Sequence, residues 1–150
     1  MKQWMKKHKS RGFTLVELLI VIVIIGILAG SLLLVMGSGT DKANATKIVS
    51  NMRVLKAAEL MYYADNDEYT ATITDLEEYL DRGIPTDYTY TAVTGLVTSG
   101  DCSIKVEGIA AGGGVAGKLE DMAESSGLYK NDLSTEYAAT DTEAYMIVNK

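Results

Sequence analysis

One uninterrupted apolar run constrains the fold of this chain more than any other feature. Leu18 to Met36 form 19 consecutive positions without a charge, and Ser31 is their only polar side chain. That length meets the minimum for a helix that crosses a bilayer. A carboxylate, Glu17, stands directly before the run. An acid at the centre of a membrane helix costs about 2.5–3.5 kcal/mol and less near an end, so its presence indicates a specific role.

Charge is distributed unevenly around this run. Five basic residues and no acid lie in the first twelve positions: Lys2, Lys6, Lys7, Lys9 and Arg11. This bias predicts a cytoplasmic N-terminus. The remaining residues, 13–150, contain nine basic and 20 acidic side chains, a formal charge of −11. An acidic body repels phosphate, which disfavours nucleic acid as a partner.

The segment after the apolar run predicts a joint rich in helix breakers and then the amphipathic half of the long helix. Gly37 to Asp41, GSGTD, is rich in helix breakers and offers Ser38 and Thr40 as N-caps. From Lys42 to Ala64, apolar residues recur at steps of three and four, as on one face of a helix. They are Ala45, Ile48, Val49, Met52, Leu55, Ala58, Met61 and Tyr62, while Lys47, Arg53, Lys56 and Glu59 are expected on other faces.

The rest of the chain predicts a small mixed domain. DLEEYLDR, Asp75 to Arg82, and GKLEDMAESSG, Gly117 to Gly127, are typical of short helices. Three segments alternate in polarity and predict strands: Asp87–Val93, Cys102–Gly108 and Glu143–Asn149. The expected fold is therefore α+β, with a long N-terminal helix, transmembrane and then amphipathic, packed on a small antiparallel sheet.

The junction Lys9-Ser-Arg-Gly-Phe-Thr-Leu-Val-Glu-Leu18 resembles the type III signal of prepilins. That family includes type IV pilins, type II secretion pseudopilins and competence pilins. The resemblance is strong from Lys9 to Gly30 and looser through Ala64, and DLEEYLDRGIP is similar to the segment before the family's sheet. It implies a pilin-like fold, cleavage between Gly12 and Phe13 by a membrane aspartyl peptidase, and N-methylation of Phe13.

The resemblance also implies a role for Glu17 in assembly. In the family's filaments this carboxylate pairs with the N-terminal amine of a neighbouring subunit, here the amine of Phe13. Two charges that would each be unfavourable in an apolar core partly offset one another. Sliding of the helices would leave both charges unpaired, so the pair would also fix the axial register. No catalytic residue is expected, because His8 is the only histidine and lies in the leader.

We therefore expect four regions: a leader, 1–12; a transmembrane and polymerisation helix, 13–36; its amphipathic continuation, 37–64; and a globular domain, 65–150. The expected function is that of a structural, non-enzymatic subunit of a type IV pilus-like filament. Alternatives are a type II secretion pseudopilin, a competence pilin or a monomeric membrane-tethered binding module.

Expected partners are further copies of the chain, the prepilin peptidase and methyltransferase, an inner-membrane assembly platform, minor pilins and the membrane. The subunit would first span the inner membrane once and then join an extracellular or periplasmic filament. No cofactor or metal is expected.

Two positions depart from the family's pattern. Leu34 stands where the family often has proline, so glycines such as Gly26 or Gly30 would have to supply any local unwinding of the helix. Cys102 is the only cysteine, so the domain cannot close the C-terminal disulfide that many type IV pilins carry.

Other patterns in the chain are weak. The apolar run exceeds the length of a secretory signal, although Ala29 and Ser31 fit its cleavage site. GGGVAGKL, Gly112 to Leu119, lacks the Ser or Thr of a phosphate-binding loop. Asp65, Asp67 and Glu68 fail the EF-hand spacing, and the resemblance to pseudopilins makes Asp101, Asp132 or Asp141 further candidates for a calcium site. Asn44-Ala-Thr46 is a minimal glycosylation pattern.

Overall fold

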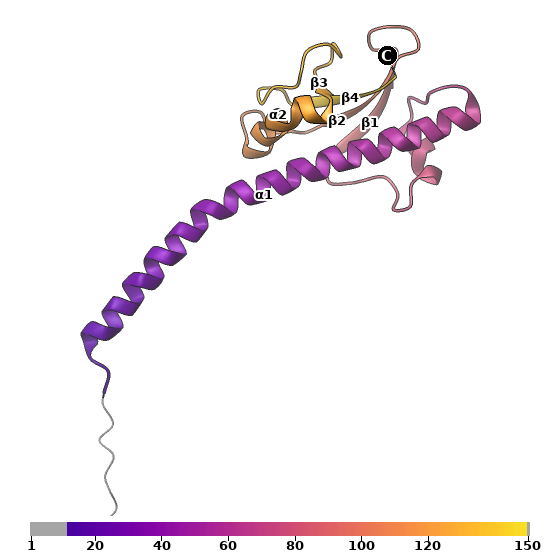
Figure 1. Cartoon of the computed structure of the whole chain (residues 1–150). Helices are drawn as coiled ribbons and strands as arrows, with labels where there is room; N and C mark the ends of the chain where they lie inside the picture. Colours follow the sequence, from indigo (N-terminus) through magenta and orange to yellow (C-terminus); the bar gives the residue numbers. More distant parts are fainter. Residues whose placement is uncertain (1–11, 150) are drawn as a thin grey trace, which may run out of the picture. The chain divides into compact units, whose positions relative to one another are not determined.

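A computed structural model describes residues 12–149, apart from the side chains of residues 33–36, and shows a long helix and an antiparallel sheet (Figure 1). The elements, in chain order, are α1 (Leu15–Asn66), the 3-10 helix η1 (Ile73–Tyr79), β1 (Thr89–Thr94), β2 (Cys102–Glu107), α2 (Gly114–Ser126), β3 (Leu128–Tyr129) and β4 (Glu143–Asn149). The chain divides into two compact units at Met36 and Gly37. The predicted α+β fold, a long N-terminal helix with a small antiparallel sheet, is confirmed.

In the first unit, α1 is apolar on every side. Phe13 and the leucines, isoleucines and valines from Leu15 to Leu32 are all exposed. Its most apolar window has a mean hydropathy of 3.2, and none of that window is buried within the chain. A helix that is hydrophobic all round requires a membrane or other helices around it. By length and composition, α1 can cross a membrane.

α1 continues through the breaker-rich joint Gly37–Asp41, as the predicted long helix requires. Thr40 does not cap a new helix; its hydroxyl donates to the Gly37 carbonyl at 2.8 Å, within the helix. Each glycine lowers helix preference by only about 1 kcal/mol relative to alanine. Extending an existing helix also avoids the unfavourable step of nucleating a second one.

The amphipathic face of α1 is confirmed over most of its predicted length. Six of the eight predicted residues are buried: Ala45, Ile48, Val49, Met52, Leu55 and Ala58. Met61 is instead exposed, and Tyr62 is half-buried against Tyr79, with ring centroids 6.1 Å apart. Glu59, predicted on an outer face, is completely buried. It follows Leu55 by four positions, so helical geometry places both on one face.

The sheet has the strand order β1-β2-β4-β3, and all neighbouring strands are antiparallel. β4 has the predicted bounds, and β1 and β2 lie within two residues of theirs. β3 was not predicted, since two residues carry no periodicity. The first short helix is a 3-10 helix, η1, that begins and ends earlier than predicted.

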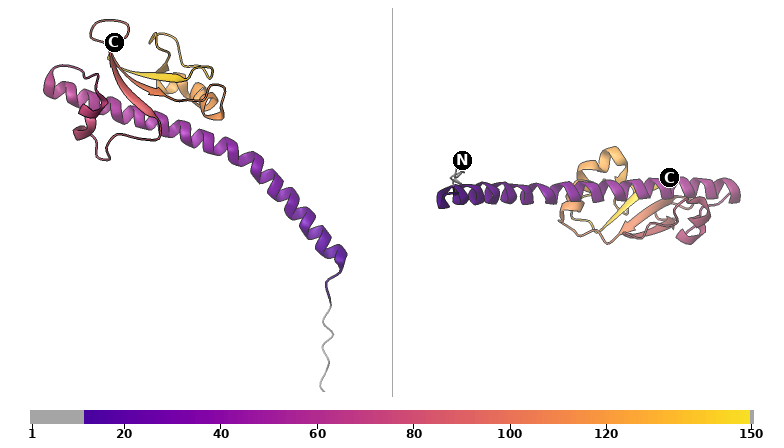
Figure 2. Two further views of the ribbon diagram at one scale, coloured as in Figure 1. Left: turned by 180° about the vertical axis from the view of Figure 1, so that it is seen from behind. Right: turned by 90° about the horizontal axis from the view of Figure 1, so that it is seen from below.

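In the second unit, the core lies between α1, the sheet and α2 (Figure 2). Ile48 and Met52 of α1 meet Ile104 and Val106 of β2 in one buried cluster, which α2 extends with Leu119. α2 begins three residues before the predicted position and ends as predicted, with Gly127 in the left-handed conformation. The core thus fixes the second part of α1 beneath the sheet.

Candidate functional site

The residues predicted for cleavage and assembly lie at the start of α1. Gly12 and Phe13 precede the helix and belong to no regular element, and Phe13 is 82% exposed. A side chain at Gly12 would meet nothing within 4 Å in the isolated chain. The bond between these residues is therefore accessible. The basic residues of the leader lie outside the described residues.

Glu17 and Thr14 form a reciprocal cap at the start of α1. The Glu17 Oε2 atom accepts hydrogen bonds from the Thr14 backbone N–H at 2.9 Å and from the Thr14 hydroxyl at 2.8 Å. In return, the Glu17 N–H donates to the Thr14 hydroxyl oxygen at 3.2 Å. This arrangement is a capping box, which satisfies N–H groups that the first turn of a helix leaves unpaired.

This cap was not predicted, although its signal T-x-x-E is present in the sequence from Thr14 to Glu17. The cap changes the interpretation of the acid, because Glu17 already has a role within one subunit. Both side-chain bonds use Oε2. A carboxylate can accept about four hydrogen bonds, so Oε1 is still available to a donor from another molecule.

The acids considered for calcium each close a turn of their own. Asp101 accepts the N–H groups of Leu96, Val97 and Thr98 at 2.7–2.8 Å, and these backbone bonds, that of Thr98 foremost, lower its pKa. Asp132 accepts the hydroxyl and N–H of Thr135, which lowers its pKa to about 2.

Asp141, the third of these acids, accepts the Ala138 N–H at 3.0 Å and pairs with Lys130 at 3.4 Å. Within residues 12–149, no three His, Cys, Asp or Glu side chains gather closely enough to hold a metal ion.

The glycine-rich segment before α2 is packed against an acid. Gly113 stands at the N-cap of α2 in an extended conformation, with no side-chain cap bond. The Asp41 carboxylate of α1 occupies the space that a Cβ on Gly114 would fill. A helix N-terminus attracts anions, and here a carboxylate of the chain itself lies at that end. This geometry opposes phosphate binding there.

Comparisons with known proteins agree with the N-terminal geometry. Residues 7–33 match the family model described as the prokaryotic N-terminal methylation motif. The type II secretion system core protein G of Klebsiella michiganensis is 37% identical over 87 residues, which cover 57% of this chain and 61% of that protein. The Escherichia coli K12 protein of the same name is 41% identical over 73 residues, 49% of this chain and 50% of that protein.

The chain thus matches less than two thirds of the length of these relatives. Among solved structures, the major type IV pilin PilA1 from Clostridium difficile is similar, with a TM-score of 0.56 and 16% identity. The match covers 76% of this chain and 100% of that one. At this identity, the likeness concerns the fold alone.

Proposed function

We propose that the chain, which is similar to type II secretion core protein G relatives and carries the prokaryotic N-terminal methylation motif, is a structural subunit of a type IV pilus-like filament. One observation carries the proposal. The first part of α1 exposes apolar side chains on all sides, yet its first turn contains the carboxylate of Glu17. This carboxylate caps the helix through Oε2, so its Oε1 atom can accept a hydrogen bond from another subunit. Such a helix is suited to a membrane first and to a bundle of identical helices afterwards.

Maturation begins with cleavage between Gly12 and Phe13 by a prepilin peptidase, followed by N-methylation of Phe13. The accessible position of both residues outside α1 supports this step. Cleavage creates an α-amine on Phe13, which the uncut chain lacks. The amine is positively charged and lies at the edge of an apolar helix, so it requires a counter-charge once the helix enters a filament core.

Glu17 supplies that counter-charge to a neighbouring subunit. Its Oε2 atom holds the cap with Thr14, while Oε1 accepts a hydrogen bond from the incoming Phe13 amine. Charge-assisted bonds of this kind are short and strong. A displaced helix would leave the amine and one carboxylate oxygen without partners, so the pair selects one register.

The subunit would wait in the inner membrane with its N-terminus in the cytoplasm, and then join an extracellular or periplasmic filament. Its partners would be copies of itself, the peptidase and methyltransferase, an assembly platform and minor pilins. The role is structural rather than enzymatic. A second candidate is a type II secretion pseudopilin, which the 37–41% identity to core protein G relatives favours.

The test separates the charge of Glu17 from its cap. Glutamine also serves in a capping box, so Glu17→Gln keeps the cap and removes the counter-charge. We expect a normal membrane pool and a loss of sheared filament of about tenfold or more, because an unpaired charge in an apolar interior costs about 3–5 kcal/mol. The control, Thr14→Ala, removes the hydroxyl from the cap and keeps the charge of Glu17, so it should assemble better than Glu17→Gln.

Intact mass of the envelope protein measures maturation in the same samples and should show a wild-type chain that starts at methylated Phe13. Normal filament yield from Glu17→Gln would exclude the proposed pairing. A wild-type chain that never forms filaments in peptidase-containing cells would exclude the filament function itself.

A further inference from the structure

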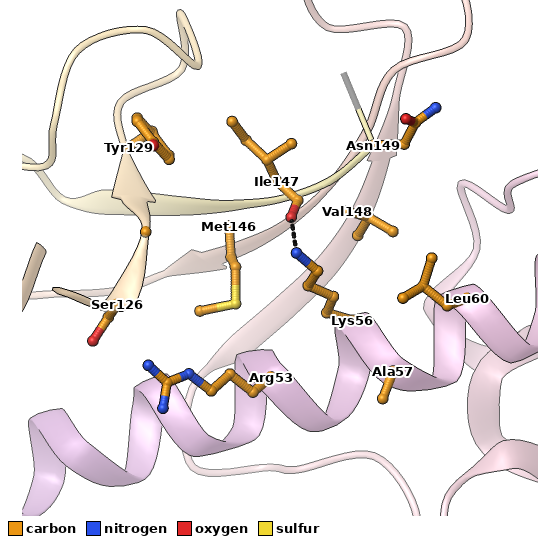
Figure 3. A pocket seen from close by; sticks show the side chains of 11 residues that line it. Arg53, Lys56, Ala57, Leu60, Ser126, Tyr129, Met146, Ile147, Val148 and Asn149 are labelled. Carbon is orange, nitrogen blue, oxygen red and sulfur yellow. Dashed lines mark hydrogen bonds between the residues drawn. The ribbon is translucent and has the colours of Figure 1, made fainter. Parts of the chain in front are cut away.

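A groove in the second unit lies between α1 and the last residues of β4 (Figure 3). Lys56 and Leu60 extend from α1 toward β4, Met146 points back toward α1, and Arg53 extends along α1 toward Ser126. The cavity has a volume of about 640 Å³, and none of its lining residues is acidic. The groove is therefore apolar at its floor and basic at its margin.

The groove follows an open edge of the sheet. β3 pairs with β4 only at Tyr145 and Met146, so within the described chain Ile147–Asn149 have no strand on that side. The Ile147 carbonyl accepts a hydrogen bond from the Lys56 ammonium at 2.7 Å. An open edge of this kind is a natural place for another polypeptide to contact the sheet.

The basic margin has no acidic partner within the described residues. Arg53 is exposed and makes no hydrogen bond or ion pair there, and Lys56 bonds only to the Ile147 carbonyl. Four other lysines are each paired with an acid of the same chain: Lys47, Lys105, Lys118 and Lys130. The groove thus carries two uncompensated cations on a strongly acidic body.

The opposite charge accumulates where α1 ends. Residues 65–81 contain seven acids and no basic residue. Glu68 and Glu77 are exposed, and no hydrogen bond or ion pair is seen for their side chains within residues 12–149. The last turn of α1 holds no basic residue to balance its negative end. An external cation would relieve this repulsion.

Part of this acidic segment folds back along α1, where Glu78 and Asp81 line a pocket with Val54 and Ala57. Within the described residues, however, no ion pair joins Arg53 or Lys56 to the segment 65–81 of the same chain. We propose that the groove at Arg53 and Lys56 binds the acidic segment 65–81 of a second copy of the chain. This inference rests on the proposed filament function.

The pairing is head-to-tail, because it joins two different surfaces of identical subunits. Such heterologous contacts do not close on a two-fold axis and can repeat without limit, as a helical filament requires. Charge across the contact would act mainly on partner choice and register, while the apolar helices would supply most of the affinity.

Charge reversal in the full-length chain tests this contact. Arg53→Glu should lower the yield of sheared filament by about tenfold or more, since like charges across an interface are strongly disfavoured. Glu68→Arg combined with Glu77→Arg should lower it similarly. All three substitutions together should restore most of the yield. Two controls make the same charge changes outside the contact: Lys42→Glu on α1 and Glu124→Arg on α2, both exposed.

Filament assembly by the wild type in the same cells tests the proposed filament function. Recovery of filament yield in the triple variant tests the proposed contact. If wild type assembles and Arg53→Glu assembles equally well, the contact is refuted while the function stands. Failure of the triple variant to recover, with a normal membrane pool, would show that the groove binds something else, such as an anionic lipid. If the two control variants lose as much filament yield as Arg53→Glu does, the proposed contact is also refuted.

Discussion

Glu59 shows how one residue can join three segments of the second unit. Its side chain is completely buried, and Oε1 accepts the Thr70 N–H at 2.8 Å, which ties the chain after α1 back to the helix. The other oxygen, Oε2, has no hydrogen-bond partner within the described residues. Burial raises the pKa of Glu59, against the lowering effect of the Thr70 bond. Burial and the nearby Glu59 raise the pKa of Cys102 to about 12, so this cysteine stays a neutral thiol.

Substitution of Glu59 by glutamine should stabilise the protein at neutral pH. The folded-state pKa of Glu59 is above the unfolded one, so its contribution to stability is fullest below the unfolded pKa and is lost as pH rises through the folded pKa. Glutamine keeps the acceptor for Thr70 and does not ionise. At pH 8 we expect Glu59→Gln to exceed wild type by about 1–3 kcal/mol, because the wild-type side chain must then carry a charge in a buried position and the amide does not.

Urea unfolding of residues 37–150 across pH measures this difference. The advantage of Glu59→Gln should shrink as pH falls from 8 through the raised folded-state pKa of Glu59, and it should be smallest below the ordinary value of 4.5, where the wild-type carboxyl is protonated. Asp75 also raises the pKa of Glu59, and Cys102 lies against it, so both stay unchanged in the series. The exposed Glu124→Gln serves as control and should show no such pH-dependent gain. A difference that is constant from pH 3 to pH 8 would contradict titration of Glu59.

At the scale of elements, local sequence patterns predicted the strands and helix ends that the structure contains, but they did not by themselves decide where α1 is continuous. β4 was found at its predicted bounds because Glu143 to Asn149 alternates and favours β-formers. The end of α2 was found because Gly127 adopts a left-handed conformation that glycine favours. The residues Gly37–Asp41 do not interrupt α1, because a few local breakers weigh little against an established helix.

The functional and buried polar residues were likewise predicted only in part. The sequence predicted roles in cleavage and assembly for Gly12, Phe13 and Glu17, and these roles stay predictions; Gly12 and Phe13 directly precede α1, and Glu17 lies in its first turn. It did not indicate that Glu59 is buried, because binary patterning assigns a charged residue to an outer face. Burial depends on the sheet and loop that cover that part of α1, and a single helix pattern does not contain them.

At the N-terminus of α2, Gly114→Ala should fail to give the stabilisation that alanine normally brings to a helix. Alanine favours a helix by about 1 kcal/mol over glycine. Here the added methyl group would occupy the space of the Asp41 carboxylate, which lies at the positive end of α2. Displacement of a negative charge from a helix N-terminus costs about 0.3–1 kcal/mol, so the two effects oppose and we expect little or no net gain.

Gly117→Ala is the matched control in the same helix, since a Cβ there meets nothing within 4 Å. It should raise stability by up to about 1 kcal/mol through helix preference alone. Thermal unfolding of both variants gives the comparison. Equal stabilisation by the two substitutions would contradict a role for Asp41 at the start of α2.

At the scale of the whole molecule, the two units satisfy their apolar residues in different ways. Those from Leu15 to Leu32 have no cover within the chain and depend on lipid or on other subunits. Those from Ala45 to Ala58 are covered by the sheet and α2. The second unit therefore contains its own core and does not require the first for folding, whereas polymerisation would require the first.

Residues 37–150 should accordingly fold alone as a soluble monomer with mixed helix and sheet by circular dichroism. Two neighbouring substitutions on α1 test which face holds that core. Leu55 is completely buried, so Leu55→Asp places a charge among apolar side chains at a cost of several kcal/mol, comparable with the whole stability of a small domain. Val54 is 51% exposed, so Val54→Asp should change stability by about 0.5 kcal/mol or less. Thermal melts of the two variants should therefore differ widely, with Leu55→Asp largely unfolded at 37 °C, and equal melting temperatures would refute the assigned face of α1.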